Sequence, residues 1–153
     1  MTILQQFILG LAIVSPIMIL SFFFCWMKEN FGYVDAVWSY SVGGLALFYF
    51  CLNSDILSVK HWIALCLTLI WSLRLGTHLL KRASREEEDG RYQEMRAAWS
   101  HDLKRRVFAF FQFQAIAASV MSVAPLIIMT HGFQFGLATD WIAIAIAILA
   151  LIG

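Results

Sequence analysis

ILQQFILGLAIVSPIMILSFFFCWM, residues 3–27, runs without a single charged side chain. An α-helix rises about 1.5 Å per residue and the hydrocarbon of a bilayer is about 30 Å thick, so about 20 apolar residues suffice to cross it. We therefore predict that this stretch is a membrane-spanning helix in which Pro16 is tolerated as a kink. No basic residue precedes it and no small-residue cleavage site follows, so we expect it to stay in the membrane rather than be removed as a signal peptide.

Three further apolar runs are long enough to cross a membrane, at about 35–52, 61–80 and 107–130. A fifth begins near Trp141 and is still apolar at Gly153, which corresponds to only about 20 Å of helix. The sequence thus predicts an all-α fold, a polytopic transmembrane helix bundle with four complete spans plus an incomplete fifth. We expect residues 1–153 to form a single transmembrane domain that is truncated within its fifth helix; the alternative is that the fifth run forms a re-entrant or tilted half-helix.

The composition supports a membrane environment. Of the 153 residues, 61% are hydrophobic and 14% are charged, whereas a soluble domain carries about 25% charged residues. The lipid bilayer is therefore the expected partner of the surface. The net charge of +1 gives no field that would favour nucleic acid. The cysteines lack the spacing of zinc ligands, so no metal site is predicted.

Basic residues are distributed unevenly between the two ends of the predicted bundle. If the helices alternate in direction, nine of the eleven Lys and Arg residues fall on one side, Lys60 falls on the other and Arg74 lies within a span. The positive-inside rule then predicts an external N-terminus and a charged cytoplasmic loop at about 81–106. Within this loop, Tyr92, Met95 and Trp99 have the spacing of an amphipathic helix over about 91–99, and the acidic run 86–89 is predicted to be a solvated turn.

The third span carries a polar stripe. Trp71, Arg74, His78 and Arg82 are spaced by 3, 4 and 4 positions and so share one helical face. One interpretation is that Arg74 snorkels to the cytoplasmic interface beside an interfacial tryptophan. The other is that the stripe lines a cavity open to the cytoplasm and binds an anionic ligand.

The second span opens with Asp35 and Trp38 on one face. Asp35 has an ordinary structural explanation, because a carboxylate is favoured at a helix N-terminus, and Trp38 suits the interfacial belt. Alternatively, an acid at the edge of a cavity could orient a substrate or donate a proton.

Five short motifs occur in a characteristic order. They are D-x-x-W-S from Asp35, W-x-L-R-L-x-x-H-L from Trp71, E-D-G-R-Y from Glu88, R-x-x-W from Arg96 and F-F-Q-x-Q from Phe110. In order and spacing they resemble the steroid 5-alpha-reductase-like bacterial membrane proteins catalogued as domain of unknown function 1295. The resemblance extends from about Val34 to about Ala115.

The resemblance implies a reductase of the bacterial inner membrane that transfers hydride from NADPH to the carbon–carbon double bond of a lipid-like enone, a hydrophobic small molecule. It implies catalytic roles for Asp35 and Tyr92 and a substrate-binding role for Trp38. The cofactor would be bound by Arg74, His78 and Arg91.

The chain departs from that family pattern in one respect. The family continues with further helices and a nucleotide-binding R-H-P-N-Y-type stretch, whereas the only prolines here are Pro16 and Pro125. We therefore expect an N-terminal portion of such a reductase, without activity by itself. The alternatives are a non-catalytic membrane scaffold or partner-binding protein and a lipid-linked methyltransferase, which would respond to S-adenosylmethionine rather than to NADPH.

Overall fold

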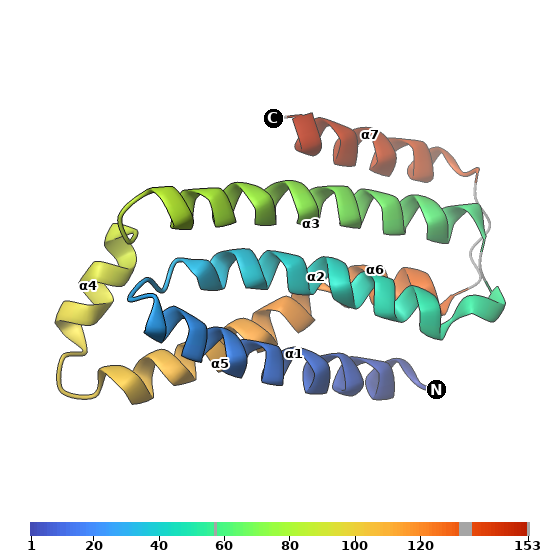
Figure 1. Ribbon diagram of the computed structural model, residues 1–153. Helices are drawn as coiled ribbons and strands as arrows, with labels where there is room; N and C mark the ends of the chain where they lie inside the picture. Colours follow the sequence, from blue (N-terminus) through green and yellow to red (C-terminus); the bar gives the residue numbers. More distant parts are fainter. Residues whose placement is uncertain (57, 132–135, 153) are drawn as a thin grey trace.

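A computed structural model describes residues 1–56, 58–131 and 136–152 of the chain, and every regular element in these ranges is helical (Figure 1). The elements are α1 (Ile3–Met27), α2 (Tyr33–Leu52), a 3-10 turn η1 (Ser54–Ile56), α3 (Val59–Arg85), α4 (Gly90–Ala98), α5 (Leu103–Met121), α6 (Val123–Thr130) and α7 (Ala138–Ile152). By length and composition α1, α2, α3 and the segment Leu103–Thr130 can each cross a membrane, and α7 is a shorter apolar helix. The prediction of an all-α bundle with four spans and a shorter fifth is confirmed.

The helix boundaries agree best in the apolar segments. The first span was predicted with the bounds that α1 has, and α2 begins two residues before the predicted 35–52. The predicted connection at 81–106 is too wide, because α3 continues to Arg85 and α5 already begins at Leu103. Arg82 and Arg85 in the last turn of α3 interact favourably with the negative end of the helix dipole, which explains why a charged sequence continues this helix.

The fourth predicted span, 107–130, is broken into α5 and α6 at Ser122. Pro125 accounts for the break. Its nitrogen has no hydrogen to donate to the carbonyl of Met121, four residues earlier, and its ring crowds that carbonyl. Pro16 lies within α1, which the structure describes as one uninterrupted helix.

The second helix occupies the middle of the bundle and packs against α1, α3, α5 and α6. Its contact with α3 is close and partly polar: the Ser72 hydroxyl donates to the Ser39 carbonyl over 2.8 Å, and the Ser39 hydroxyl donates to the Ser72 carbonyl over 3.2 Å. A Cβ atom at Gly43 would overlap the Ser72 side chain, so this glycine permits the approach.

Helix α4 lies across one end of the bundle, where α1 ends, α2 begins, α3 ends and α5 begins (Figure 1). The helices therefore alternate in direction, and the basic residues of the 81–106 segment gather at this α4 end. Lys60 lies at the opposite end, near the start of α3. The α4 end is where the predicted site residues from different helices can meet.

Candidate functional site

Helix α4 is held to the bundle by one apolar face. Tyr92 is only 2% exposed and its ring lies 6.1 Å from that of Phe110 in α5. Met95 and Trp99 are partly buried and pack against the same core. The amphipathic helix predicted at 91–99 is thus confirmed within one residue at each end. The Tyr92 side chain on its buried face lies beside the start of α2.

Three predicted site residues meet at this point. The Tyr92 hydroxyl donates to Oδ1 of Asp35 over 2.8 Å, and the Arg91 guanidinium donates to Oδ2 of the same carboxylate over 3.1 Å. Asp35 belongs to the first turn of α2, whereas Tyr92 and Arg91 belong to α4. The contacts use both carboxylate oxygens, one for a neutral donor and one for a cation.

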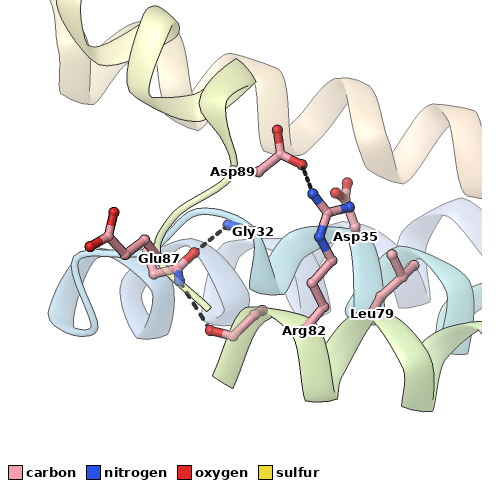
Figure 2. A pocket seen from close by; sticks show the side chains of 8 residues that line it. Gly32, Asp35, Leu79, Arg82, Glu87 and Asp89 are labelled. Carbon is pink, nitrogen blue, oxygen red and sulfur yellow. Dashed lines mark hydrogen bonds and ion pairs between the residues drawn. The ribbon is translucent and has the colours of Figure 1, made fainter. Parts of the chain in front are cut away.

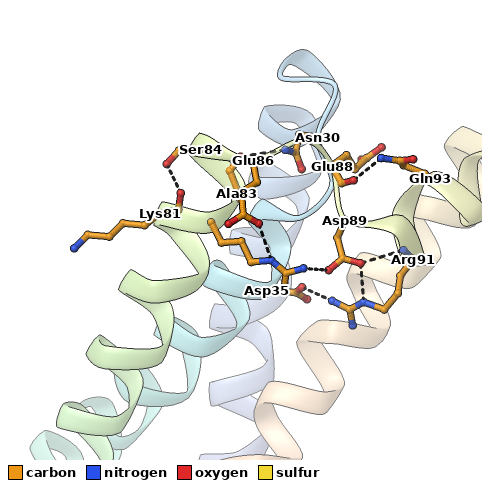
Figure 3. A network of polar contacts seen from close by, with 11 residues as sticks. Asn30, Asp35, Lys81, Ala83, Ser84, Glu86, Glu88, Asp89, Arg91 and Gln93 are labelled. Atoms are coloured by element: carbon orange, nitrogen blue, oxygen red, sulfur yellow. Dashed lines mark hydrogen bonds and ion pairs between the residues drawn. The ribbon is translucent and has the colours of Figure 1, made fainter.

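A second carboxylate, that of Asp89, extends this contact into a chain of charges (Figure 3). Asp89 is the N-cap of α4, where its Oδ1 accepts from the backbone N–H of Arg91 over 3.0 Å. The same oxygen accepts from the Arg91 side chain over 3.2 Å, and Oδ2 accepts from Arg82 of α3 over 2.7 Å. Carboxylates and guanidiniums therefore alternate from α3 through α4 to α2.

These surroundings set the protonation of the groups on α4. Burial, followed by the negative charge of Asp35, raises the pKa of Tyr92 well above its ordinary value, so the phenol stays protonated and remains a donor. The backbone N–H and then the guanidinium of Arg91 lower the pKa of Asp89, which stays ionised. The hydrogen bond to Asp89 raises the pKa of Arg91.

Glu88 ties α4 to the turn between α1 and α2. Its carboxylate accepts from the backbone N–H of Phe31 over 2.7 Å and from Arg96 over 2.6 and 3.2 Å. The Arg96 guanidinium also lies over the Phe31 ring, 4.0 Å from its centre. The prediction that residues 86–89 form a solvated turn is therefore wrong for Glu88 and Asp89, whose side chains are 10% and 18% exposed.

A small cavity of about 20 Å³ opens beside Asp35 (Figure 2). It is lined by Asn30, Gly32, Asp35, Leu79, Arg82, Ala83, Glu87 and Asp89. This is space for a water molecule. With three carboxylates in its lining, the cavity in this form does not suit a nucleotide phosphate.

The predicted cofactor residues Arg74 and His78 lie elsewhere. Both are exposed on α3, two turns and one turn before Arg82, and neither lines the cavity beside Asp35. The structure thus brings Asp35, Tyr92 and Arg91 together and leaves Arg74 and His78 on the flank of α3.

Trp38, the predicted substrate residue, lies one turn after Asp35 and packs edge-on against Trp71, with ring centres 6.2 Å apart. Its indole nitrogen is buried and has no hydrogen-bond acceptor among the described residues. Trp71 lines an apolar cavity of about 260 Å³ with Val42, Leu67, Thr68, Met121, Pro125, Ala147 and Ala150. A second cavity of about 260 Å³ shares Leu67, Thr68, Pro125 and Ala147 and reaches Lys60 and Asp140, which form an ion pair of 2.7 Å.

Comparison with known proteins places this architecture in a family. The family described as "protein of unknown function (DUF1295)" matches residues 7–153. The chain belongs to the DUF1295 family. The match is wider than the resemblance at 34–115 that the short motifs carry, and it includes most of α1 and all of α6 and α7. No curated protein and no solved structure matches the chain.

Sequence reasoning missed part of this DUF1295 site. The motifs and spacing assign Arg82 only to the polar stripe of the third span and assign no site role to Glu88, Asp89 and Arg96. Asp89 carried a usable signal, because an aspartate followed by glycine and a helical pattern indicates an N-cap and hence a fixed carboxylate. Within the described ranges no group of three or more His, Cys, Asp or Glu side chains is arranged to hold a metal ion.

Proposed function

We propose that this DUF1295 protein contributes the carbonyl-polarising residues of a membrane reductase that uses NADPH to reduce the double bond of a lipid-like enone. The observation that carries the proposal is the 2.8 Å hydrogen bond between Tyr92 and Asp35, two acids from different segments of the chain. Family membership and the reductase-like motifs at both residues support it.

In this reaction Tyr92 serves as the proton donor. Hydride adds to the β carbon of the enone, the electrons of the double bond form an enolate, and the enolate oxygen takes the phenolic proton. The phenol has a single hydrogen, so the substrate carbonyl must replace Asp35 as its acceptor. Because Asp35 also accepts from Arg91, its carboxylate keeps a partner when Tyr92 turns to the substrate. Solvent at the exposed Arg91 side of the site then restores the proton.

The exposed side chains of Arg74, His78 and Arg91 suit the cofactor better than the Asp35 cavity does. Accessible guanidinium groups bind phosphate well and an imidazole can add a hydrogen bond; Arg74 and His78 are exposed on α3, and Arg91 is exposed at the rim of the site. These three residues are the ones that we propose to hold NADPH, which when bound supplies the hydride.

The apolar cavities support a hydrophobic substrate. They extend along α3 from Lys60 to Trp71, and Trp71 packs on Trp38. A buried N–H without an acceptor is costly, and a carbonyl or hydroxyl oxygen on a substrate would satisfy that of Trp38. We therefore propose that the hydrocarbon part lies along α3 and that the polar end approaches Trp38 and Asp35.

Thermal unfolding of this chain fused to the R-H-P-N-Y-type nucleotide-binding segment of the family, purified in detergent, tests the proposal against its alternatives. NADPH should raise the melting temperature, and S-adenosylmethionine should not. Tyr92→Phe should leave the NADPH effect in place but remove most of the additional protection by an enone lipid, because it lacks the hydroxyl that donates to the substrate carbonyl. Protection by S-adenosylmethionine alone would favour a methyltransferase, and protection by neither cofactor would contradict the reductase in favour of a scaffold.

A further inference from the structure

A groove lined by residues of α1 and α5 lies outside the site described above. Its residues belong to the end of α1 and the start of α5, which lie at the α4 end of the bundle (Figure 1). It has a volume of about 400 Å³ and is lined by Phe22, Phe23, Lys104, Arg105 and Phe108. Three aromatic rings and two cations therefore face one space, where an apolar span meets the charged end of the molecule.

The aromatic part of the groove is a preformed apolar floor. The Phe22 ring is buried and makes edge contacts with Phe23 and Phe108, each with ring centres 5.4 Å apart. Phe23 and Phe108 remain 52% and 38% exposed. An acyl chain can lie on these rings without burying a polar group, because only aromatic carbon faces it.

The cationic part is not neutralised by the protein. Lys104 and Arg105 lie in the first turn of α5 and are exposed, and among the described residues neither side chain has an ion pair or hydrogen bond. Arg82, Arg91 and Arg96, at the same end of the bundle, are each bound to a carboxylate. The nearest acid in sequence, Asp102, is exposed and does not line the groove.

We propose that this groove binds one anionic phospholipid, with the phosphate between Lys104 and Arg105 and an acyl chain over Phe23 and Phe108. Basic pockets at the ends of membrane helices recognise anionic headgroups, and the rings supply the apolar contact that a lipid can make and a free phosphate cannot. The site is independent of the reductase proposal, because none of its residues belongs to the Asp35 network.

Native mass spectrometry of the detergent-purified chain tests this proposal. Phosphatidylglycerol should bind more tightly than phosphatidylcholine with the same acyl chains. The double substitution Lys104→Gln, Arg105→Gln should weaken phosphatidylglycerol binding about 25-fold, since each basic residue near an anionic surface contributes about fivefold. Phe108→Ala, which keeps both cations, should weaken the binding of the same lipid several-fold.

Lys81→Gln, Arg85→Gln is the matched control. It removes the same charge from exposed positions at the same end of the bundle that line none of the cavities described above, so binding should change by less than about threefold, as expected for diffuse attraction. Equal losses in the two double variants, or equal binding of the two lipids, would overturn the proposal. So would unchanged binding in Phe108→Ala together with inorganic phosphate competing as well as lipid, since the ligand would then be a free anion.

Discussion

The Tyr92 hydroxyl donates to Oδ1 of Asp35 over 2.8 Å, so a helix that lies across the end of the bundle is fastened to the first turn of a membrane-spanning helix. The contact joins positions 57 residues apart. Because Arg91 binds the other oxygen of Asp35, two residues in the first turn of α4 hold one carboxylate from two sides. The position of α4 and the hydrogen bonding of Tyr92, the proposed proton donor, therefore depend on each other.

Tyr92→Phe should remove this hydrogen bond and keep the packing of the ring against Phe110. We expect the free energy of unfolding to fall by about 1–2 kcal/mol, because Asp35 keeps Arg91 as a partner. Titration with sodium dodecyl sulfate in mixed micelles measures the change. Tyr33→Phe is the control, since among the described residues the Tyr33 hydroxyl makes no hydrogen bond, and equal losses in the two variants would contradict the role of the contact.

The raised pKa of Tyr92 predicts a loss of stability at high pH. The folded protein holds the phenolic proton more tightly than the unfolded chain, so the contribution is complete below the ordinary tyrosine pKa of about 10 and is lost as pH rises above it. Melting temperatures between about pH 8 and 11 should fall more steeply for the natural chain than for Tyr92→Phe. Parallel curves would show that the phenol does not contribute.

The sequence predicted the helices from a single physical requirement, that about 20 apolar residues cross a bilayer. This requirement finds α1 from its composition alone. It does not predict helical structure for polar segments at the membrane surface. For this reason the sequence does not predict the last residues of α3 or the first residues of α5. The break at Ser122 had a sequence signal in Pro125, but Pro16 is tolerated within α1, so a proline alone does not indicate a break.

The sequence predicts the residues of the site but not the contacts between them, because these contacts join different segments of the chain. Asp35, Tyr92 and Arg91 were named from motifs, and only the position of α4 shows that they are in contact. The partners of Glu88 and Asp89 depend on which guanidinium reaches which carboxylate, and helical spacing within one segment does not determine that. The acidic run therefore resembled an ordinary solvated turn.

Glu88→Gln should destabilise the protein by about 1–3 kcal/mol, because the charge-assisted contacts of a largely buried carboxylate with Arg96 are weakened. Glu87→Gln is the adjacent control: its carboxylate is exposed and has no hydrogen bond or ion pair among the described residues, so stability should stay within about 0.5 kcal/mol. Unfolding titrations of the two variants compare the same chemical change one position apart. Equal effects would show that Glu88 does not fasten α4.

Membrane orientation can be tested with one exposed serine at each end of the bundle. Ser84 lies at the α4 end and Ser54 lies at the opposite end. The excess of basic residues predicts that the α4 end is cytoplasmic. In a variant without Cys25, Cys51 and Cys66, an impermeant thiol reagent applied to intact cells should label Ser54→Cys and spare Ser84→Cys. The reverse pattern would invert the predicted orientation.

Arg74 distinguishes a cofactor site from a snorkelling side chain. A guanidinium binds phosphate through a planar pair of donors, and lysine keeps the charge but loses this geometry. If Arg74 binds NADPH, Arg74→Lys in the chain fused to the family's nucleotide-binding segment should weaken the affinity about 10- to 150-fold, the equivalent of one charge-assisted contact of about 1.5–3 kcal/mol. His78→Ala should weaken it less, because a neutral imidazole offers one ordinary hydrogen bond.

Arg85→Lys, at the exposed end of α3, is the control and should leave the affinity unchanged. Because lysine snorkels as well as arginine does, an unchanged NADPH titration for Arg74→Lys would remove this residue from the cofactor site.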